Sequence, residues 1–170
     1  MGGHYEANFK EGFMSTLRIA VLVVLLTFTV ALATEVAPVK PSDKDKCPVC
    51  GMFVAKYPDF LAQITFQDGS HAFFDGAKDM FKYYFDLHKY NPSQSLSKIA
   101  AIYVTDYYSL ASIDGRKAWY VIGSDVYGPM GRELIPFAKE DEAREFMEDH
   151  GGGKILAFEV VSPDVIAGLD

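Results

Sequence analysis

The sequence predicts an α+β fold of two tandem ββαβ units behind an N-terminal apolar segment. Three observations predict it: short β-branched or alternating runs bounded by turn residues, two stretches with apolar residues at helical spacing, and the same order of these features in both halves. Residues 34–170 are enough for one compact domain. We expect that domain over residues 47–162, with one unit over about 47–106 and the other over about 115–162.

The first 33 residues have the features of a signal peptide. A short cationic start at residues 14–18 precedes an uncharged, mostly aliphatic run to residue 33, and Ala31-Leu32-Ala33 fits a signal peptidase site. The run is shorter than the ~20 residues that span a bilayer comfortably, so cleavage is favoured over a retained membrane anchor. We therefore expect export to the periplasm and a flexible linker over the polar, proline-containing residues 34–46.

The first unit is predicted from local patterns. Residues 60–66 alternate loosely, residues 67–70 are turn formers and residues 71–74 form a second apolar run, which together indicate a hairpin. Asp75 is expected to cap the following helix, whose apolar face recurs from residue 77 to residue 88 until Asn91-Pro92 ends it. Residues 99–105, β-branched and aromatic, are predicted as the returning strand.

The second unit repeats that order. Strands are expected at residues 117–122 and 134–137, with a Gly-Pro-Met-Gly turn at 128–131 between them. A helix follows, with acidic residues 140–142 in its first turn and the glycines 151–153 at its end, and then a strand at residues 155–161. Residues 163–170 are expected to form a tail.

Charge and motifs narrow the classes of function. The chain carries 23 acidic and 16 basic residues, a net charge of −7, and no basic stripe interleaved with aromatic residues, which disfavours nucleic-acid binding. No nucleophile with a base, glycine-rich phosphate loop or His-Glu-x-x-His pattern is found. We therefore expect a binding protein, with proteins or cations as partners, and not an enzyme.

The most informative motif is Cys47-Pro48-Val49-Cys50-Gly51-Met52, which places the only two cysteines and a methionine within six residues. Thiolates and a thioether are soft donors that favour monovalent copper. Three other interpretations compete with copper. A redox pair would normally begin a helix after a strand, and a structural zinc site needs four ligands, for which His71 and His88 are distant candidates. A plain disulfide or buried thiol pair is the simplest interpretation. Met52 favours copper among these.

Other soft donors are weighed by their surroundings. Met130 lies between glycines in a turn, where an apolar side chain has little to pack against, so it is the best further thioether candidate. Met80 and Met147 fall on apolar helix faces and are expected in the core. His150 closes a helix, where the dipole stabilises a charged imidazole without a metal, and both a structural and a ligand role stay open.

An ordered set of motifs resembles the NosL family, copper-binding accessory proteins of nitrous oxide reductase. They are the cysteine motif, Pro58-Asp59-Phe60-Leu61-Ala62-Gln63-Ile64, Phe73-Phe74-Asp75, Ala101-Ile102-Tyr103-Val104, Ala118-Trp119-Tyr120-Val121, Gly128-Pro129-Met130-Gly131 and His150-Gly151-Gly152. The resemblance extends from Cys47 to about Val161. It implies a fold related to the treble-clef group, which includes TRASH domains and part of organomercurial lyase.

The resemblance also implies a function and a ligand set. It implies an exported Cu(I) chaperone that receives copper from an exporter or donor chaperone and passes it to an acceptor cuproenzyme, nitrous oxide reductase. The implied ligands are one of Cys47 and Cys50, Met130 and His150. This chain departs from many members in having two cysteines in the motif, which makes a two-thiolate site available, and in having no cysteine at a lipoprotein-type site after the apolar run.

Two alternative functions stay open at this point. One is an exported TRASH-like module that binds zinc or another thiophilic metal, and the other is a thiol-disulfide oxidoreductase. For the copper interpretation, affinity should fall at low pH because a thiol must lose its proton to bind. A disulfide between Cys47 and Cys50 should abolish the site.

Overall fold

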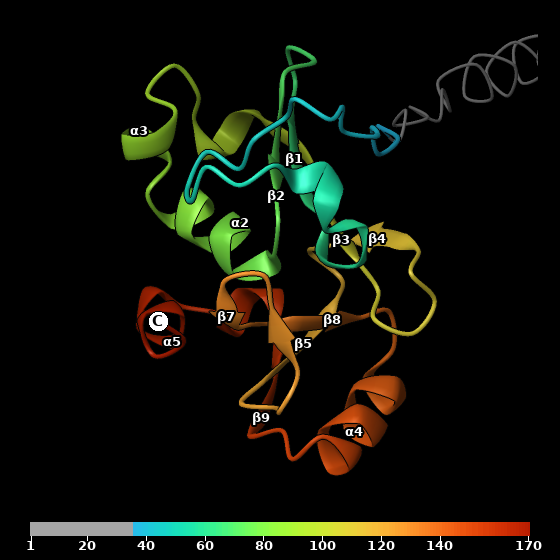
Figure 1. Cartoon of the computed structure of the whole chain (residues 1–170). Coiled ribbons are helices and arrows are strands. Elements are labelled where there is room, and N and C mark those ends of the chain that lie inside the picture. Colours follow the sequence, from blue (N-terminus) through green and yellow to red (C-terminus); the bar gives the residue numbers. More distant parts are fainter. Residues whose placement is uncertain (1–35) are drawn as a thin grey trace, which may run out of the picture. The chain divides into compact units, whose positions relative to one another are not determined.

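The computed structural model describes residues 36–170, which form one unit of mixed helices and strands (Figure 1). This agrees with the predicted α+β class. The predicted signal peptide, residues 1–33, lies outside the described residues. Within residues 36–170, every helix is too short or too polar to cross a lipid bilayer.

The first sheet has the strand order β2-β1-β3-β4, and all neighbouring strands are antiparallel. Its strands are β1 (Ala62–Phe66), β2 (His71–Phe74), β3 (Ile99–Thr105) and β4 (Ser112–Asp114). The predicted hairpin joins β1 to β2 through a turn in which Gly69 has a φ of +83°, a conformation that glycine adopts without steric cost. Every residue of β1 is buried, which explains why its alternation is weak in the sequence. Strand β4 was not predicted.

Helix α2 (Ala77–Phe85) packs on this sheet, and α3 (Leu87–Tyr90) follows it. The single helix predicted from residue 77 to residue 88 is therefore divided, because Asp86 leaves the helical conformation with a φ of −123° and a ψ of 48°. The predicted cap was also wrong. Gly76 is the N-cap and Asp75 makes no capping bond, because Glu133 Oε1 accepts from Lys78 N at 2.6 Å instead.

The second sheet has the strand order β8-β5-β9, again fully antiparallel. Its strands are β5 (Trp119–Ile122), β8 (Ile135–Phe137) and β9 (Lys154–Ala157), with the small hairpin β6 (Tyr127–Gly128) and β7 (Gly131–Arg132) between β5 and β8. Helix α4 (Glu140–Asp149) joins β8 to β9. In both sheets the earliest strand is flanked by the strands before and after the helix, as β2-β1-β3 and β8-β5-β9.

Short 3₁₀ helices connect these elements. They are η1 (Val54–Lys56), η2 (Pro58–Phe60), η3 (Leu96–Lys98) and η4 (Phe158–Val160). The strand predicted over residues 155–161 is shorter than expected, because η4 takes its second half.

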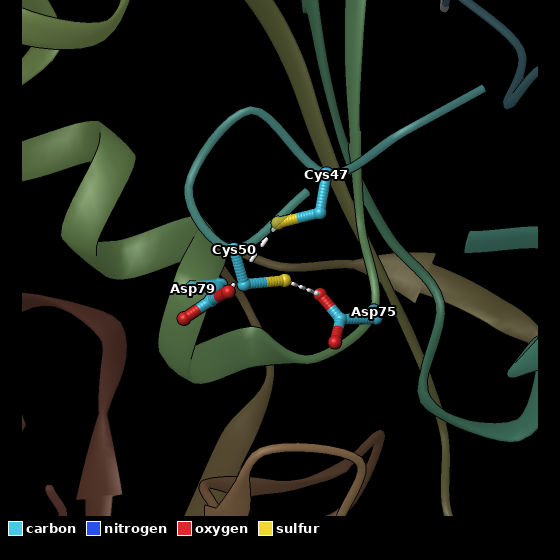
Figure 2. A group of neighbouring side chains, drawn as sticks. All are labelled: Cys47, Cys50, Asp75 and Asp79. Carbon is cyan, nitrogen blue, oxygen red and sulfur yellow. Dashed lines mark hydrogen bonds between the residues drawn. The ribbon is translucent and has the colours of Figure 1, made fainter. Parts of the chain in front are cut away.

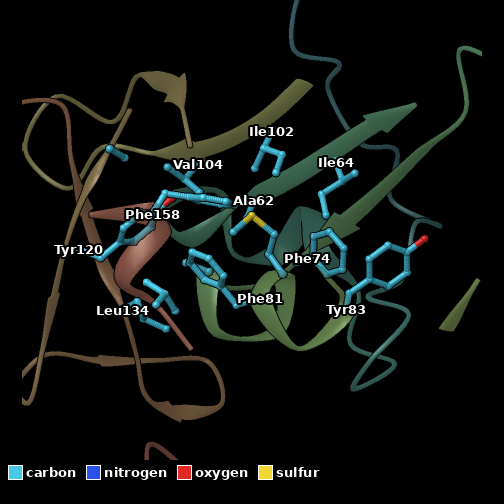
Figure 3. Close-up of a cluster of buried hydrophobic side chains, with 14 of the residues drawn as sticks. Ala62, Ile64, Phe74, Phe81, Tyr83, Ile102, Val104, Tyr120, Leu134 and Phe158 are labelled. Carbon is cyan, nitrogen blue, oxygen red and sulfur yellow. The ribbon is translucent and has the colours of Figure 1, made fainter. Parts of the chain in front are cut away.

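The larger hydrophobic core lies between α2 and the first sheet and includes residues from both halves (Figure 3). The Phe81 ring of α2 lies 5.2 Å from the ring of Tyr120 and 5.0 Å from that of Phe158. A second, smaller core lies between α4 and the second sheet and includes Phe137 and Phe146, both fully buried. Because Tyr120 and Val121 point to opposite faces of β5, that strand serves both cores.

Residues 163–170, expected to be a tail, fold onto α2. They form α5 (Pro163–Ala167), where the Ser162 side chain accepts from Val165 N, and they bury Ile166 and Leu169. These two apolar residues, three positions apart, are too few to predict a helix from the sequence, but they are enough to pack against α2. Residues 36–45, predicted to be a flexible linker, contain neither helix nor strand, and Val39 N donates to Gln63 Oε1 at 3.0 Å.

Candidate metal site

The two cysteines lie in a tight loop that precedes the first sheet. Gly51 N donates to Cys47 O at 2.9 Å, and Cys47 N donates to Met52 O at 2.9 Å. The loop needs a glycine after the second cysteine, because Gly51 has a φ of +82°, which other L residues rarely adopt. Both sulfur atoms consequently lie on the side of the loop that faces the start of α2 (Figure 2).

Two carboxylates from the β2–α2 connection meet these thiols. Asp75 follows β2 directly, and Asp79 lies four residues later, so both project from the same side of the helix start. The Cys50 thiol donates to Asp75 Oδ1 at 3.1 Å, and the Cys47 thiol donates to Asp79 Oδ2 at 3.3 Å (Figure 2). Each sulfur therefore has its own carboxylate partner.

The four side chains form a group of suitable size for one metal ion. One donor atom from each of Cys47, Cys50, Asp75 and Asp79 lies within 4.8 Å of every other. Ligand atoms of a tetrahedral sulfur and oxygen shell lie about 3.3–3.8 Å apart, from metal bonds of about 2.0–2.3 Å. A contraction of about 1 Å would thus close the group around an ion.

Burial controls the protonation of the thiols. Cys47 is 1% exposed, whereas Cys50 is partly exposed and forms the open side of the group. Loss of hydration raises the pKa of Cys50 to about 12, with further increases from Asp75 and Asp79, and it raises the pKa of the more buried Cys47 further. Both thiols are protonated at neutral pH. Redox-active cysteines have the opposite property, a lowered pKa at a helix start.

The carboxyl groups of the donor group have an oxygen that no hydrogen bond satisfies. Asp75 is 1% exposed, yet its Oδ2 has no hydrogen-bond partner. Leaving such an oxygen buried and unpaired costs about 1–3 kcal/mol or more, because it has lost water without gaining a donor. Lys82 Nζ lies 4.0 Å from Asp79 Oδ1 and offsets part of the charge. A cation in the group would satisfy the remainder.

The NosL family model matches residues 38–166, most of the described chain and all of the cysteine site. The chain belongs to the NosL family. The resemblance drawn from the sequence motifs is thereby confirmed.

Individual NosL proteins show the same relationship. A protein from Stutzerimonas stutzeri, described as copper-binding lipoprotein NosL, is 31% identical over 132 residues. The match covers 73% of this chain and 65% of that relative, so this chain spans slightly less than two thirds of the relative's length.

A solved NosL structure shares the fold of this chain. The crystal structure of the copper chaperone NosL from Shewanella denitrificans gives a TM-score of 0.64 at 23% identity, over 75% of this chain and 97% of that one. The solution structure of apo-NosL from Achromobacter cycloclastes gives a TM-score of 0.44 at 30% identity, over 62% and 87%.

The two methionines of the NosL motifs have different surroundings. Met52 is half-buried, and its main-chain oxygen helps to close the cysteine loop. Met130 occupies the β6–β7 turn with 44% of its surface exposed, and its main-chain oxygen accepts from Lys78 Nζ at 2.9 Å. Because Lys78 directly precedes Asp79, this contact ties the turn to the helix that carries a member of the donor group.

The histidines are placed elsewhere. His150 ends α4, stacks on Phe146 at a centroid distance of 4.3 Å and has its Nδ1 2.9 Å from Asp125 Oδ1. This places it against the smaller core, and it is not a member of the donor group formed by residues of the described chain. His71 and His88 are exposed on β2 and α3.

Sequence reasoning found the cysteines of this group but missed both carboxylates. Asp75 was interpreted as a helix cap, and Asp79 was given no role. The available signal was two acids four residues apart at the start of an otherwise apolar helix face. This pair of acids can be distinguished from ordinary helix-capping residues only once Glu133, 58 residues beyond Asp75, is known to cap the helix.

Proposed function

We propose that this protein is an exported Cu(I) chaperone that holds copper through the thiolates of Cys47 and Cys50 and passes it to a periplasmic cuproenzyme. Nitrous oxide reductase is the acceptor that the NosL family implies. The observation that carries the proposal is the convergence of both thiols in one donor group, in which Cys47 is buried and Cys50 is partly exposed. The names of the relatives, copper-binding lipoprotein and copper chaperone, support copper as the cargo.

The different exposure of the two thiols suits transfer by ligand exchange. Cys50 is the more accessible thiol, so it meets an incoming or departing copper ion first, and the buried Cys47 completes the site. Soft thiolates favour Cu(I), and a low coordination number leaves room for a ligand of the acceptor. Asp75 Oδ1 and Asp79 Oδ2 already accept the S–H hydrogens, so these carboxylates are the nearest acceptors for the protons that copper displaces.

Additional donors complete the proposal. Met130 and Met52 are the thioether candidates, and Met130 is favoured because it is exposed on a turn tied to α2. His150, which the NosL resemblance implies as a ligand, is held by Asp125 and Phe146 in the described structure and would have to leave them to bind the same ion.

A zinc or other thiophilic-metal module is the second candidate, and one observation favours it. The two thiols lie with two buried carboxylates, a four-donor set of the kind that divalent zinc accepts, and Asp75 Oδ2 has no partner. Occupancy by zinc and by copper is separated by competition between the two ions.

We further propose a domain arrangement for the whole chain. Residues 1–33 serve as the signal peptide for export to the periplasm or as an uncleaved anchor, and residues 34–46 link it to the metal-binding domain. The domain is a pair of ββαβ units related by duplication. The equivalent strand orders β2-β1-β3 and β8-β5-β9 support this relationship.

Anaerobic titration of the reduced protein with Cu(I) against a competing chelator tests the function. We expect one tightly bound ion per chain, lost when Cys47→Ser and Cys50→Ser are combined. Met147→Leu, a conservative change in a half-buried residue next to the smaller core, is the matched control and should bind as the unchanged protein does. A wild-type protein that retains zinc and takes up no Cu(I) would favour the second candidate.

A further inference from the structure

We infer that Lys78 and Glu133 are positioning residues that hold the β6–β7 turn, and with it Met130, against the start of α2. The inference rests on the proposed function, in which Met130 supplies a thioether to copper. It assigns a role to two charged residues that neither the cysteine motif nor the donor group includes.

The first step is burial: both side chains are polar, titratable groups buried in the fold. Lys78 is 2% exposed and Glu133 is 3% exposed. Lysine and glutamate are almost never buried to this extent without specific partners, because loss of hydration is costly. Their partners should therefore show what the burial achieves.

The second step is the identity of those partners, which are mainly main-chain groups. Lys78 Nζ donates to Met130 O at 2.9 Å and to Leu169 O at 3.3 Å. Glu133 Oε1 accepts from Lys78 N at 2.6 Å and from Leu134 N at 2.9 Å. One lysine thus contacts the β6–β7 turn with its side chain and Glu133 with its main chain. The segment is therefore bound to α2 at Met130 and again at Glu133.

The third step is the close approach of the backbones. Glu133 lies between Gly76 at the helix start and Gly128 in the hairpin. A Cβ atom at Gly76 would lie 2.1 Å from Glu133 Oε2, and one at Gly128 would lie 3.0 Å from Glu133 Cγ. A side chain at either position would therefore push the Glu133 side chain from its place between the hairpin and the helix.

The contact between Lys78 and Met130 lies next in sequence to a residue of the donor group. Lys78 is followed by Asp79, whose carboxylate accepts from the Cys47 thiol. The main chain of Met130 is thereby bound to Lys78, the sequence neighbour of Asp79, while Met130 keeps 44% of its surface exposed. A fixed backbone with a free thioether lowers the ordering cost of recruiting a third sulfur to the ion.

The test is a double-mutant cycle on Cu(I) affinity, measured anaerobically by chelator competition with the full chain. Lys78→Gln and Met130→Leu should each weaken Cu(I) binding about 10-fold to 100-fold. If Lys78 acts through Met130, Lys78→Gln should cause no further loss in the Met130→Leu background. Lys139→Gln, at the equivalent start of α4 but fully outside the donor group, should bind as wild type does.

A second variant guards against misfolding. Gly128→Ala crowds Glu133 while leaving both charged residues in place, and its effect should also vanish in the Met130→Leu background; Gly153→Ala, where a Cβ meets only ordinary contact at 3.5 Å, is its control. Additive losses, or an unchanged affinity in Lys78→Gln and Gly128→Ala, would overturn the inference. An unchanged affinity in Met130→Leu, with binding still lost in the double cysteine variant, would overturn it while leaving the chaperone proposal standing.

Discussion

The β2–α2 and β8–α4 connections occupy equivalent places in the two sheets, yet their acidic residues have opposite surroundings. At the start of α2, Asp75 and Asp79 are buried and accept hydrogen bonds from thiols. At the start of α4, Glu140 and Glu142 pair with Arg144 and Lys139 at the protein surface. The same order of elements therefore supports a donor group in one half and a solvated helix in the other.

The cysteine loop that precedes the first sheet accounts for the donor group at the start of α2. The cysteine loop lies over the start of α2 and supplies two thiols that need buried partners. In the second half, Tyr107 of the β3–β4 connection lies at a centroid distance of 4.8 Å from Phe146 of α4, and His150 stacks on the same ring at the end of that helix. The fold provides the helix start, and the loop placed over it decides whether metal donors gather there.

The largest expected effect that sharpens this comparison is the pH dependence of copper binding. Burial keeps the thiol pKa of Cys50 near 12 and that of Cys47 still higher, so both are protonated in the metal-free protein near neutral pH. Binding through both must release two protons, and the Cu(I) dissociation constant should rise about 100-fold for each unit of falling pH. Chelator competition between pH 6 and 8 measures the slope, and a flat profile would mean that the thiols do not bind as thiolates.

The next effect concerns the carboxyl group that caps α2. Burial raises the pKa of Glu133 from 4.5 to about 8, so the folded state holds this proton more tightly than the unfolded state. The free energy of unfolding should therefore be greatest below about pH 4.5 and fall as pH rises towards 8, by at most about 1.4 kcal/mol per pH unit.

Glu133→Gln removes the titratable group but keeps the helix cap, because the amide oxygen can still accept from Lys78 N and Leu134 N. Its urea denaturation curves should lose this part of the pH dependence. If the slope is the same in Glu133→Gln and in the unchanged protein, Glu133 is not the group responsible.

A smaller effect compares the two cores. Phe81→Leu and Phe146→Leu should each lower the free energy of unfolding by about 1–3 kcal/mol, because each removes ring contacts from a fully buried site. Only Phe81 lies on the helix that carries Asp79, so Phe146→Leu should leave Cu(I) affinity unchanged. Equal weakening of copper binding by both variants would show that the two halves do not act separately at the site.

The smallest effect is expected at the surface of α4. Arg144 pairs with Glu140 across one turn of that helix in full contact with water, where ion pairs contribute little. Arg144→Ala should leave the urea midpoint where it is. A clear fall in the midpoint would mean that the acids of α4 are not merely solvated, and the contrast with α2 would weaken.

The sequence predicted what depends on local pattern and missed what depends on distant contacts. The β1–β2 hairpin, α2 and α4 follow from turn residues and helical spacing, and the cysteine loop follows from its motif. The roles of Asp75 and Asp79 depend on a loop 25 and 32 residues earlier, and that of Glu133 on a helix 55 residues earlier. An Asp before a helix usually caps it, and Asp75 does not because Glu133 makes the capping hydrogen bond instead.

The same reasoning applies to the error at the chain's end and to the surroundings of His150, whose role as a ligand stays a prediction. Residues 163–170 offered too few apolar positions to predict α5, although α2 supplies the surface that they cover. His150 was a possible ligand from the family motif, but the rings of Tyr107 and Phe146, which hold it, come together only in the folded second half.

The most direct test of the central claim is the copper K-edge absorption spectrum of the anaerobically loaded protein, which counts the sulfur neighbours of the ion. The account predicts Cu(I) with at least two sulfur neighbours, both lost when Cys47→Ser and Cys50→Ser are combined. A shell of nitrogen and oxygen alone, or an unchanged sulfur count in that double variant, would contradict it.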